Sequence, residues 1–172
     1  MKFRNTEIIK TARLLLHSIK DKDDEDLKNI LTNEEIGRTF MLPDLKSEDE
    51  IADMISWFKS LSESGDRFVY GIYLSDKLIG FVNDVDIGES HVELGYVIHP
   101  DFKGQGYATE ALRAAINEIF ASGFKKVQTG AFVGNDASIR VMQKCNMVRE
   151  SFEHEIEYKN EIHKCVYYSI EK

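Results

Sequence analysis

The sequence predicts a single α+β domain over residues 1–172, in which helices flank a mixed and mostly antiparallel sheet of about seven strands in an α/β/α layering. Three observations support this fold class. Short apolar segments separated by tight turns occupy residues 68–98, as in an antiparallel meander. A strand, a helix and a second strand then follow over residues 92–132, an order that requires two parallel neighbours joined by a right-handed crossover. Residues 147–170 have the pattern of a final hairpin.

The N-terminal segments predict one strand and one short helix. Residues 11–19 contain an apolar run with polar flanks, which is typical of a strand. The acidic cluster at residues 21–26 precedes Leu27, Ile30 and Leu31, which are spaced as on one helix face. We expect these carboxylates to lie in solvent at the helix N-terminus, where negative charge is favourable, and metal binding is the less favoured alternative.

A longer amphipathic helix is predicted after Pro43. Ser47 and Glu50 form a capping-box pattern at its start, and Gly65 is a suitable residue for its end. The apolar positions between them recur at spacings of three and four, and they are Ile51, Met54, Ile55, Phe58 and Leu61. Trp57 lies within the same segment, and we expect it to belong to the core rather than to a substrate-binding wall.

The remaining elements alternate between strands and helices. Residues 68–74, 78–82 and 91–98 are predicted strands, and turns are expected at residues 75–77 and around Gly88. A helix with a wide apolar stripe is expected to begin near Gly106 and to end at Gly123.

The C-terminal part of the chain is predicted to add three strands and one helix. Residues 126–133 form a strand, and residues 135–144 form a helix with Ile139 and Met142 facing inward. The two strands of the final hairpin are expected over 147–158 and 162–170, on either side of a polar turn.

Composition narrows the class of protein. The formal net charge of −8 disfavours nonspecific binding to nucleic acid or to an anionic membrane, but it suits a cationic amine substrate. Without an apolar run of the ~20 residues that a membrane helix needs, or a signal-peptide pattern, the chain is expected to be cytoplasmic. Cys145 and Cys165 are far apart in the sequence, so we expect two semi-buried thiols and neither a disulfide framework nor a metal site.

The stretch over residues 91–109 has the features of a phosphate-binding site. Its apolar strand runs to Ile98, Pro100 ends the strand, and a turn containing Gly104 and Gly106 leads directly into a helix. The first amides of a helix have no intrahelical partner, and the helix dipole adds partial positive charge there. Glycines allow the backbone to approach an anion closely, so we expect a phosphate group to bind at this turn.

This turn resembles the acyl-CoA diphosphate loop of the GNAT N-acyltransferase superfamily, which has the pattern Gln/Arg-x-x-Gly-x-Gly/Ala. The matching residues are Lys103-Gly104-Gln105-Gly106-Tyr107-Ala108, with Lys103 as a cation in place of Gln or Arg. The continuation into Thr109, and the words Thr-x-Arg-Leu-x-Leu at residues 11–16, are similar to the branch that acetylates ribosomal-protein N-termini.

A second segment resembles the other acyl-CoA motif of this superfamily, Asn-x-x-Ala/Ser followed by Lys-x-Gly-Phe. Here it begins at Asn135 and Ser138 and ends at Lys144, and Asn146 replaces the usual glycine at a left-handed helix stop. The resemblance implies acetyl-CoA as co-substrate and no metal. It implies that acetyl-CoA is bound by Val97, Ile98, Lys103, Gly104, Gln105, Gly106, Tyr107, Ala108, Thr109, Asn135, Ser138 and Lys144.

Two residues are the candidates for catalysis. Glu93 interrupts an apolar strand, where burial would raise its pKa toward that of a useful general base; an ion-pair role is the alternative, and His91 is a competing base. Many members of the superfamily carry a tyrosine that protonates the departing thiolate at the position of Met142, which has no proton to give. We expect Ser138 to donate that proton, and a backbone N–H near Val97 or Ile98 to contact the thioester oxygen.

Two other functions compete with acetyl transfer. A dinucleotide-binding oxidoreductase is disfavoured, because residues 125 and 126 are lysines where that fold carries an acidic residue. A non-catalytic acyl-CoA-binding sensor is the main alternative, motivated by Met142. The acceptor is expected to be a primary amine, either a peptide N-terminus or a small amine, and the sequence leaves open whether the protein is a homodimer.

Overall fold

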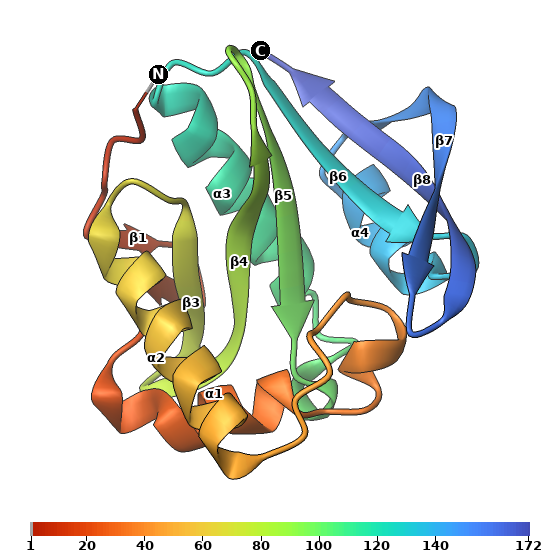
Figure 1. The fold of residues 1–172 in the computed structure, drawn as a ribbon. Coiled ribbons are helices and arrows are strands. Elements are labelled where there is room, and N and C mark those ends of the chain that lie inside the picture. The colour runs from red at the N-terminus through yellow and green to blue at the C-terminus, as the bar shows by residue number, and fades with distance from the viewer. Residues whose placement is uncertain (1) are drawn as a thin grey trace.

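The computed structural model describes residues 2–172, which form an eight-stranded sheet with helices on both faces (Figure 1). The strand order is β1-β2-β3-β4-β5-β6-β8-β7, and within the described residues β5 and β6 form the one parallel pair. The predicted mixed and mostly antiparallel sheet is therefore confirmed, with one strand more than expected. The strands are β1 (Ile8–Lys10), β2 (Leu14–His17), β3 (Val69–Leu74), β4 (Lys77–Ile87), β5 (His91–Ile98), β6 (Lys126–Phe132), β7 (Val148–Tyr158) and β8 (Glu161–Glu171).

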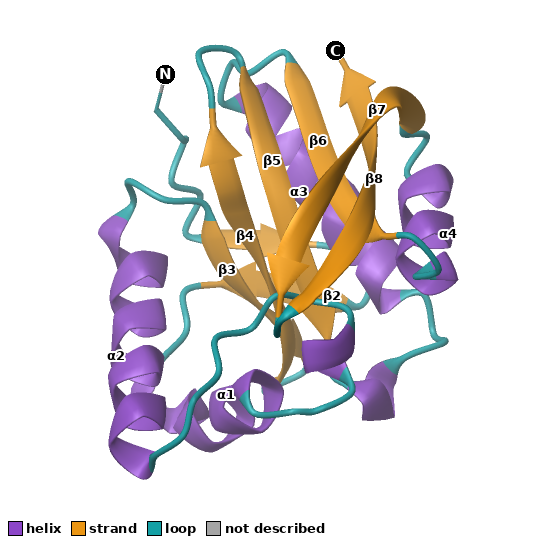
Figure 2. Ribbon diagram, turned by 45° about the vertical axis from the view of Figure 1, so that its right-hand side comes forward, coloured by secondary structure: helices purple, strands orange, loops and turns teal. Residues whose placement is uncertain are grey.

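The helices divide between the two faces of the sheet. The α-helices are α1 (Asp24–Leu31), α2 (Glu48–Ser64), α3 (Tyr107–Ala121) and α4 (Asp136–Lys144). α1 and α2 pack on one face of the sheet and α3 on the other, where Figure 2 shows it behind β5 and β6, and this gives the predicted layering. None of the helices in residues 2–172 is both long enough and apolar enough to cross a lipid bilayer.

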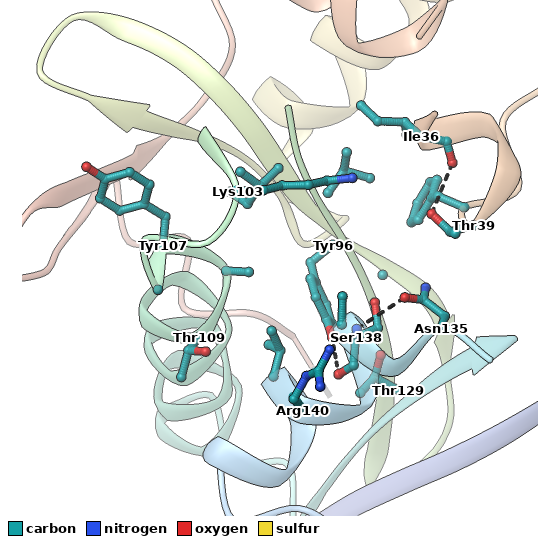
Figure 3. A pocket seen from close by; sticks show the side chains of 18 of the residues that line it. Ile36, Thr39, Tyr96, Lys103, Tyr107, Thr109, Thr129, Asn135, Ser138 and Arg140 are labelled. Atoms are coloured by element: carbon teal, nitrogen blue, oxygen red, sulfur yellow. Dashed lines mark hydrogen bonds between the residues drawn. The ribbon is translucent and has the colours of Figure 1, made fainter. Parts of the chain in front are cut away.

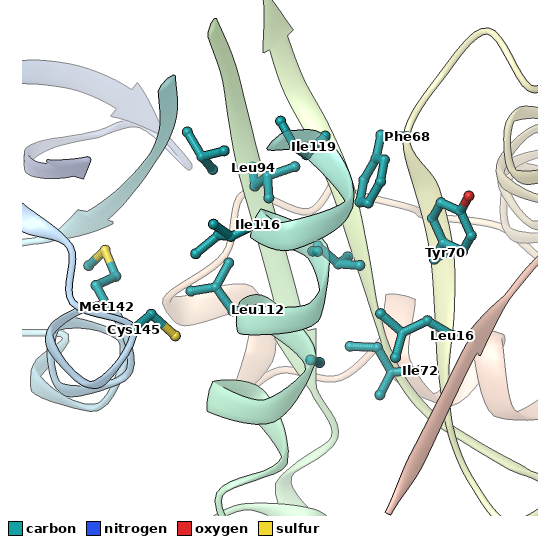
Figure 4. Packing of buried hydrophobic residues seen from close by; sticks show 14 of the residues in the cluster. Leu16, Phe68, Tyr70, Ile72, Leu94, Leu112, Ile116, Ile119, Met142 and Cys145 are labelled. Carbon is teal, nitrogen blue, oxygen red and sulfur yellow. The ribbon is translucent and has the colours of Figure 1, made fainter. Parts of the chain in front are cut away.

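The larger part of the core lies between α3 and the sheet. Leu112, Ile116 and Ile119 of α3 are almost completely buried against Leu94 of β5 and the strands beside it (Figure 4). Met142 and Cys145 extend the same cluster from the α4 side. The apolar stripe that the sequence predicted for α3 is thus the face that contacts the sheet. Both cysteines are free thiols and are buried rather than semi-buried.

The helix boundaries follow the predicted caps. The Ser47 side chain accepts a hydrogen bond from the Glu50 N–H, and Gly65 ends α2 with φ +69°. Asn146 follows α4 with φ +60°, which agrees with its expected role at a left-handed stop. These signals depend only on neighbouring residues, and they are therefore readable in the sequence.

Two expectations from the sequence are wrong. Asp23 was expected in solvent, but it is 2% exposed, because its Oδ2 accepts hydrogen bonds from the Lys20 N–H and the Tyr73 hydroxyl. Trp57 was expected in the core, but 53% of its surface is exposed. The α2 face that meets the sheet is centred on Phe58, which leaves Trp57 at its edge.

The sheet splits between its two parallel strands. β5 and β6 are paired only over His91–Glu93 and Lys126–Gln128, after which β6 stays with β8 and β5 stays with β4. Figure 1 shows the two strands diverging toward the end of β5. The edge of β5 that faces the gap therefore has no strand partner beyond Glu93.

The α3 contact predicts a specific loss of stability. Leu112→Ala should lower the free energy of unfolding by about 2–5 kcal/mol, because Leu112 is fully buried and the truncation leaves a cavity against the sheet. Urea unfolding followed by circular dichroism measures this change. Asn117→Ala, on the exposed side of the same helix, is the matched control and should change stability by less than about 0.5 kcal/mol. Equal effects of the two substitutions would contradict this account of the core.

Candidate active site

Two cavities meet at the split in the sheet. The first, which we call the α3 cavity, has a volume of about 360 Å³ and is lined by the end of β5, the loop at 102–109 and the first turns of α4. The second, the α2 cavity, has a volume of about 420 Å³ and lies between α2, the segment 39–43 and strands β4 to β8. Gly95 and Gly130 line both cavities.

The turn before α3 has the geometry of an anion site. Gly104 and Gly106 have φ values of +76° and +83°, a region that side chains disfavour. Gly106 is the N-cap of α3, and no side chain caps this helix start. The first amides of α3 are therefore available to a ligand, and the helix dipole favours an anion there.

Arg13 supports this turn, although the sequence analysis did not identify it. Its Nη1 donates to the Gln105 carbonyl at 2.9 Å, and its Nε donates to the Glu110 carboxylate at 2.7 Å. The guanidinium also lies 4.6 Å from the centre of the Tyr107 ring. Arg13 belongs to the segment before β2, so no local pattern could have revealed this contact.

Lys103 has a different environment from the one expected. Its ammonium lies 2.6 Å from the Glu35 carboxylate, on the opposite side of the cavity mouth. The Lys103 ammonium holds the pKa of the Glu35 carboxyl below its ordinary value. Arg140 and Lys144 of α4 also line the α3 cavity, and Arg140 has no carboxylate partner among residues 2–172.

The start of α4 lies beside a half-buried tyrosine, Tyr96 (Figure 3). The Asn135 side chain accepts a hydrogen bond from the Ser138 N–H at 3.2 Å, and the Tyr96 hydroxyl donates to the Ser138 carbonyl at 3.2 Å. Burial raises the pKa of Tyr96 far above its ordinary value, so this hydroxyl keeps its proton. Tyr96 was missed in the sequence, where only its alternation with Leu94 and Ile98 indicated that it faces α3.

The free edge of β5 offers backbone donors to the α3 cavity. The His99 N–H donates to the Ile79 carbonyl on the β4 side. Amide directions alternate along an antiparallel ladder, so the Val97 N–H also points to β4, whereas the Tyr96 and Ile98 N–H groups point into the gap. This alternation favours Ile98 over Val97 for the contact with a ligand oxygen.

Glu93 faces the α2 cavity from the last paired position of β5. Its Oε2 accepts a hydrogen bond from Gln128 Nε2 at 3.1 Å. Burial raises the pKa of the Glu93 carboxyl above its ordinary value; the hydrogen bond from Gln128 lowers it, and Asp86 raises it further. No lysine or arginine among the described residues pairs with this carboxylate.

The two cavities adjoin at Gly95 and Gly130, which line both, and we call this junction the passage. A Cβ atom at Gly95 would lie 3.0 Å from the Phe40 ring, and one at Gly130 would lie 2.9 Å from the Tyr167 ring. These contacts are tighter than ordinary van der Waals contacts, so a side chain at either position would crowd the passage. A ligand anchored by an anion in the α3 cavity can present its other end to a second molecule in the α2 cavity.

The chain is similar in sequence to known proteins. The sequence model of the acetyltransferase (GNAT) domain matches residues 13–148. "Uncharacterized N-acetyltransferase YoaA" of Bacillus subtilis (strain 168) is 28% identical over 158 residues, which cover 89% of each protein.

Solved structures share the fold. An acetyltransferase (GNAT family) from Bacillus anthracis superposes with a TM-score of 0.80 at 24% identity, covering 95% of this chain and 98% of that one. RimL, a ribosomal L7/L12 alpha-N-protein acetyltransferase in complex with coenzyme A, superposes with a TM-score of 0.83 at 19% identity, covering 96% and 98%. Because the domain match extends over most of the chain, this protein belongs to the GNAT family of acetyl-CoA-dependent N-acetyltransferases.

Proposed function

We propose that this enzyme transfers the acetyl group of acetyl-CoA directly to a primary amine, either a peptide N-terminus or a small amine, within a ternary complex. The observation that carries this proposal is the passage at Gly95 and Gly130, which joins an anion-binding cavity to a second cavity containing an unpaired carboxylate. The coenzyme A in the RimL structure supports the assignment of the donor.

The donor would bind in the α3 cavity. Its diphosphate would accept hydrogen bonds from the amides of the turn over Lys103–Thr109, and Lys144 and Arg140 offer positive charge nearby. Its pantetheine arm would follow the free edge of β5 and reach Asn135 and Ser138 at the start of α4. The thioester oxygen would accept the N–H of Ile98, an electrostatic contact that strengthens as negative charge develops on that oxygen.

Acyl transfer requires two proton movements. The neutral amine attacks the thioester carbonyl, the carbon–sulfur bond breaks, and the amine loses a proton to Glu93 directly or through water. The departing thiolate takes a proton from the Ser138 hydroxyl, which receives one from water in the same step, so that no alkoxide is left. Glu93 and Ser138 lie on opposite sides of β5, so the base and the acid would act from different cavities.

The structure offers little support for a non-catalytic sensor. Met142, which motivated that alternative, is fully buried in the core and does not line the α3 cavity. A sensor for acyl-CoA needs only the α3 cavity, whereas the α2 cavity and its carboxylate open onto the same passage. An acceptor site accounts for both features.

Gly106→Glu should weaken acetyl-CoA binding by roughly tenfold or more, because a carboxylate would face the diphosphate at the helix start. The Kd from isothermal titration measures this effect. Gly106→Asn is the matched control, since asparagine tolerates the left-handed conformation better than other side chains and adds no charge. Equal Kd values for the two variants would show that this turn does not bind the diphosphate of acetyl-CoA.

Ser138→Ala should lower kcat by about tenfold or more while the Kd for CoA stays within a few-fold, as expected for a contact made mainly in the transition state. The helix cap should survive, because the hydrogen bond to Asn135 uses the Ser138 backbone N–H. Steady-state kinetics and a CoA titration check both parts. An unchanged kcat would mean that water or the Tyr96 hydroxyl, rather than Ser138, protonates the thiolate. A lower kcat in Tyr96→Phe would then identify Tyr96 as the proton donor.

Glu93→Gln should reduce kcat/KM by a factor of about 10² to 10⁴, the usual contribution of a general base. Glu93 must be ionised to accept a proton, so activity falls as the pH decreases through its pKa. Because burial raises that pKa, the acidic limb of kcat/KM should lie at higher pH than for an exposed glutamate.

In the Glu93→Gln variant this acidic limb should flatten or move. His91, His154 and Asp86 lie close enough to influence Glu93, so His91→Asn is the control and should leave the limb in place. Loss of the limb in His91→Asn, with normal pH behaviour in Glu93→Gln, would assign the base to the histidine.

A further inference from the structure

The α2 cavity has mostly apolar walls. Its lining combines one face of α2 with aromatic side chains from the far side of the split sheet. The side chains that matter for the argument are Met54, Trp57, Phe58, Leu61, Phe132 and Tyr167. With a volume of about 420 Å³, the cavity is large enough for a substituent of the size of an aromatic side chain.

The charged groups of this cavity are largely satisfied within the protein. The Asp84 side chain is fully buried; its Oδ1 accepts from the Phe68 N–H at 2.6 Å, and its Oδ2 accepts from Arg67 Nε at 2.6 Å. Arg67 therefore already has its anion, and Asp84 has no free oxygen. Among the described residues that line the cavity, Glu93 is left as the one carboxylate without a cationic partner.

A buried hydrogen-bond acceptor lies at the passage. Asn83 Oδ1 has no donor among residues 2–172, while its Nδ2 donates to the Asp84 carbonyl at 3.0 Å and so fixes the orientation of the amide. A Cβ atom at Gly95 would lie 3.2 Å from this oxygen. Buried polar atoms normally have a partner, and an amine N–H that approaches the thioester past Gly95 would supply one.

We infer that the acceptor is a primary monoamine whose carbon skeleton carries a bulky apolar group, with the size of a phenyl ring or a large aliphatic side chain. This inference rests on the proposed function and specifies its substrate. The apolar group fills the α2 cavity, and the amine lies between Glu93 and Asn83 Oδ1. A polyamine is disfavoured because its additional ammonium groups would need further carboxylates. An amino acid with a free α-carboxylate is disfavoured because that group would approach the Glu93 carboxylate with no cation to pair with it.

A panel of matched amines tests the specificity. We expect kcat/KM for phenylalaninamide to exceed that for glycinamide, spermidine and free phenylalanine by at least about tenfold, since filling an apolar pocket is worth that factor per methylene or more. A small amine and a peptide N-terminus share this chemistry, and two further substrates distinguish them. A higher kcat/KM for phenethylamine indicates a small amine, and a higher kcat/KM for a tripeptide beginning with phenylalanine indicates a peptide N-terminus. Equal or faster turnover of glycinamide or spermidine overturns the inference.

Trp57 provides a second test. It is the single tryptophan of the chain, so its fluorescence should change when phenylalaninamide binds to the CoA-bound enzyme and should not change with glycinamide. Trp57→Ala should reduce the preference for phenylalaninamide over glycinamide by roughly tenfold, whereas Trp57→Phe should largely retain it. An unchanged preference in Trp57→Ala, together with a silent fluorescence signal, overturns the placement of the apolar group.

Acetyl transfer and the class of acceptor can be overturned separately. If the enzyme binds acetyl-CoA and acetylates small or polycationic amines best, the proposed function stands and the acceptor class is wrong. If no amine is acetylated although acetyl-CoA binds, both the proposed transfer and the acceptor class are overturned.

Discussion

The short pairing between β5 and β6 is the constraint on which the rest of the site depends. The two parallel strands share a ladder only over His91–Glu93, and beyond this point the edge of β5 has no strand partner. If the sheet were continuous, its ladder would occupy the Tyr96 and Ile98 amides and close the passage at Gly95 and Gly130. The same separation of strands therefore frees the backbone amides that the proposed donor would use and lets the two cavities adjoin.

Fixed dipoles, rather than net charge, are the main attraction that the proposed diphosphate site offers in an acidic protein. The chain has a formal net charge of −8, and Arg13 and Lys103 beside the turn are paired with Glu110 and Glu35. At the turn itself, an anion would meet the first amides of α3, next to two glycines in the left-handed conformation, and Arg140 and Lys144 of α4 line the same cavity. Arg13 holds the turn in place by bonding the Gln105 carbonyl, so its contribution is to the geometry of these amides.

The two faces of β5 divide the proposed chemistry. Successive side chains of a strand point to opposite faces, so Glu93 and Gly95 face the α2 cavity while Leu94 and Tyr96 face α3. A base and an acid that lie on opposite sides of the scissile bond cannot neutralise each other directly. Met142 is buried in the core, so its side chain takes no part in this chemistry. The hydroxyls of Ser138 and Tyr96 lie beside the start of α4.

The sequence by itself determined the features that depend on near neighbours. The caps at Ser47, Gly65 and Asn146, the glycine turn before α3 and the short turns of the meander over residues 68–98 could all be predicted, because each is decided within a few residues. Tertiary structure decided the exposure of Trp57, the burial of Asp23, the strand β1 and the contacts of Arg13 with Gln105 and Glu110. It also decided the two cavities, because their walls come from segments far apart in the chain. Their shape depends on where β5 and β6 separate, and no local pattern of residues specifies that point.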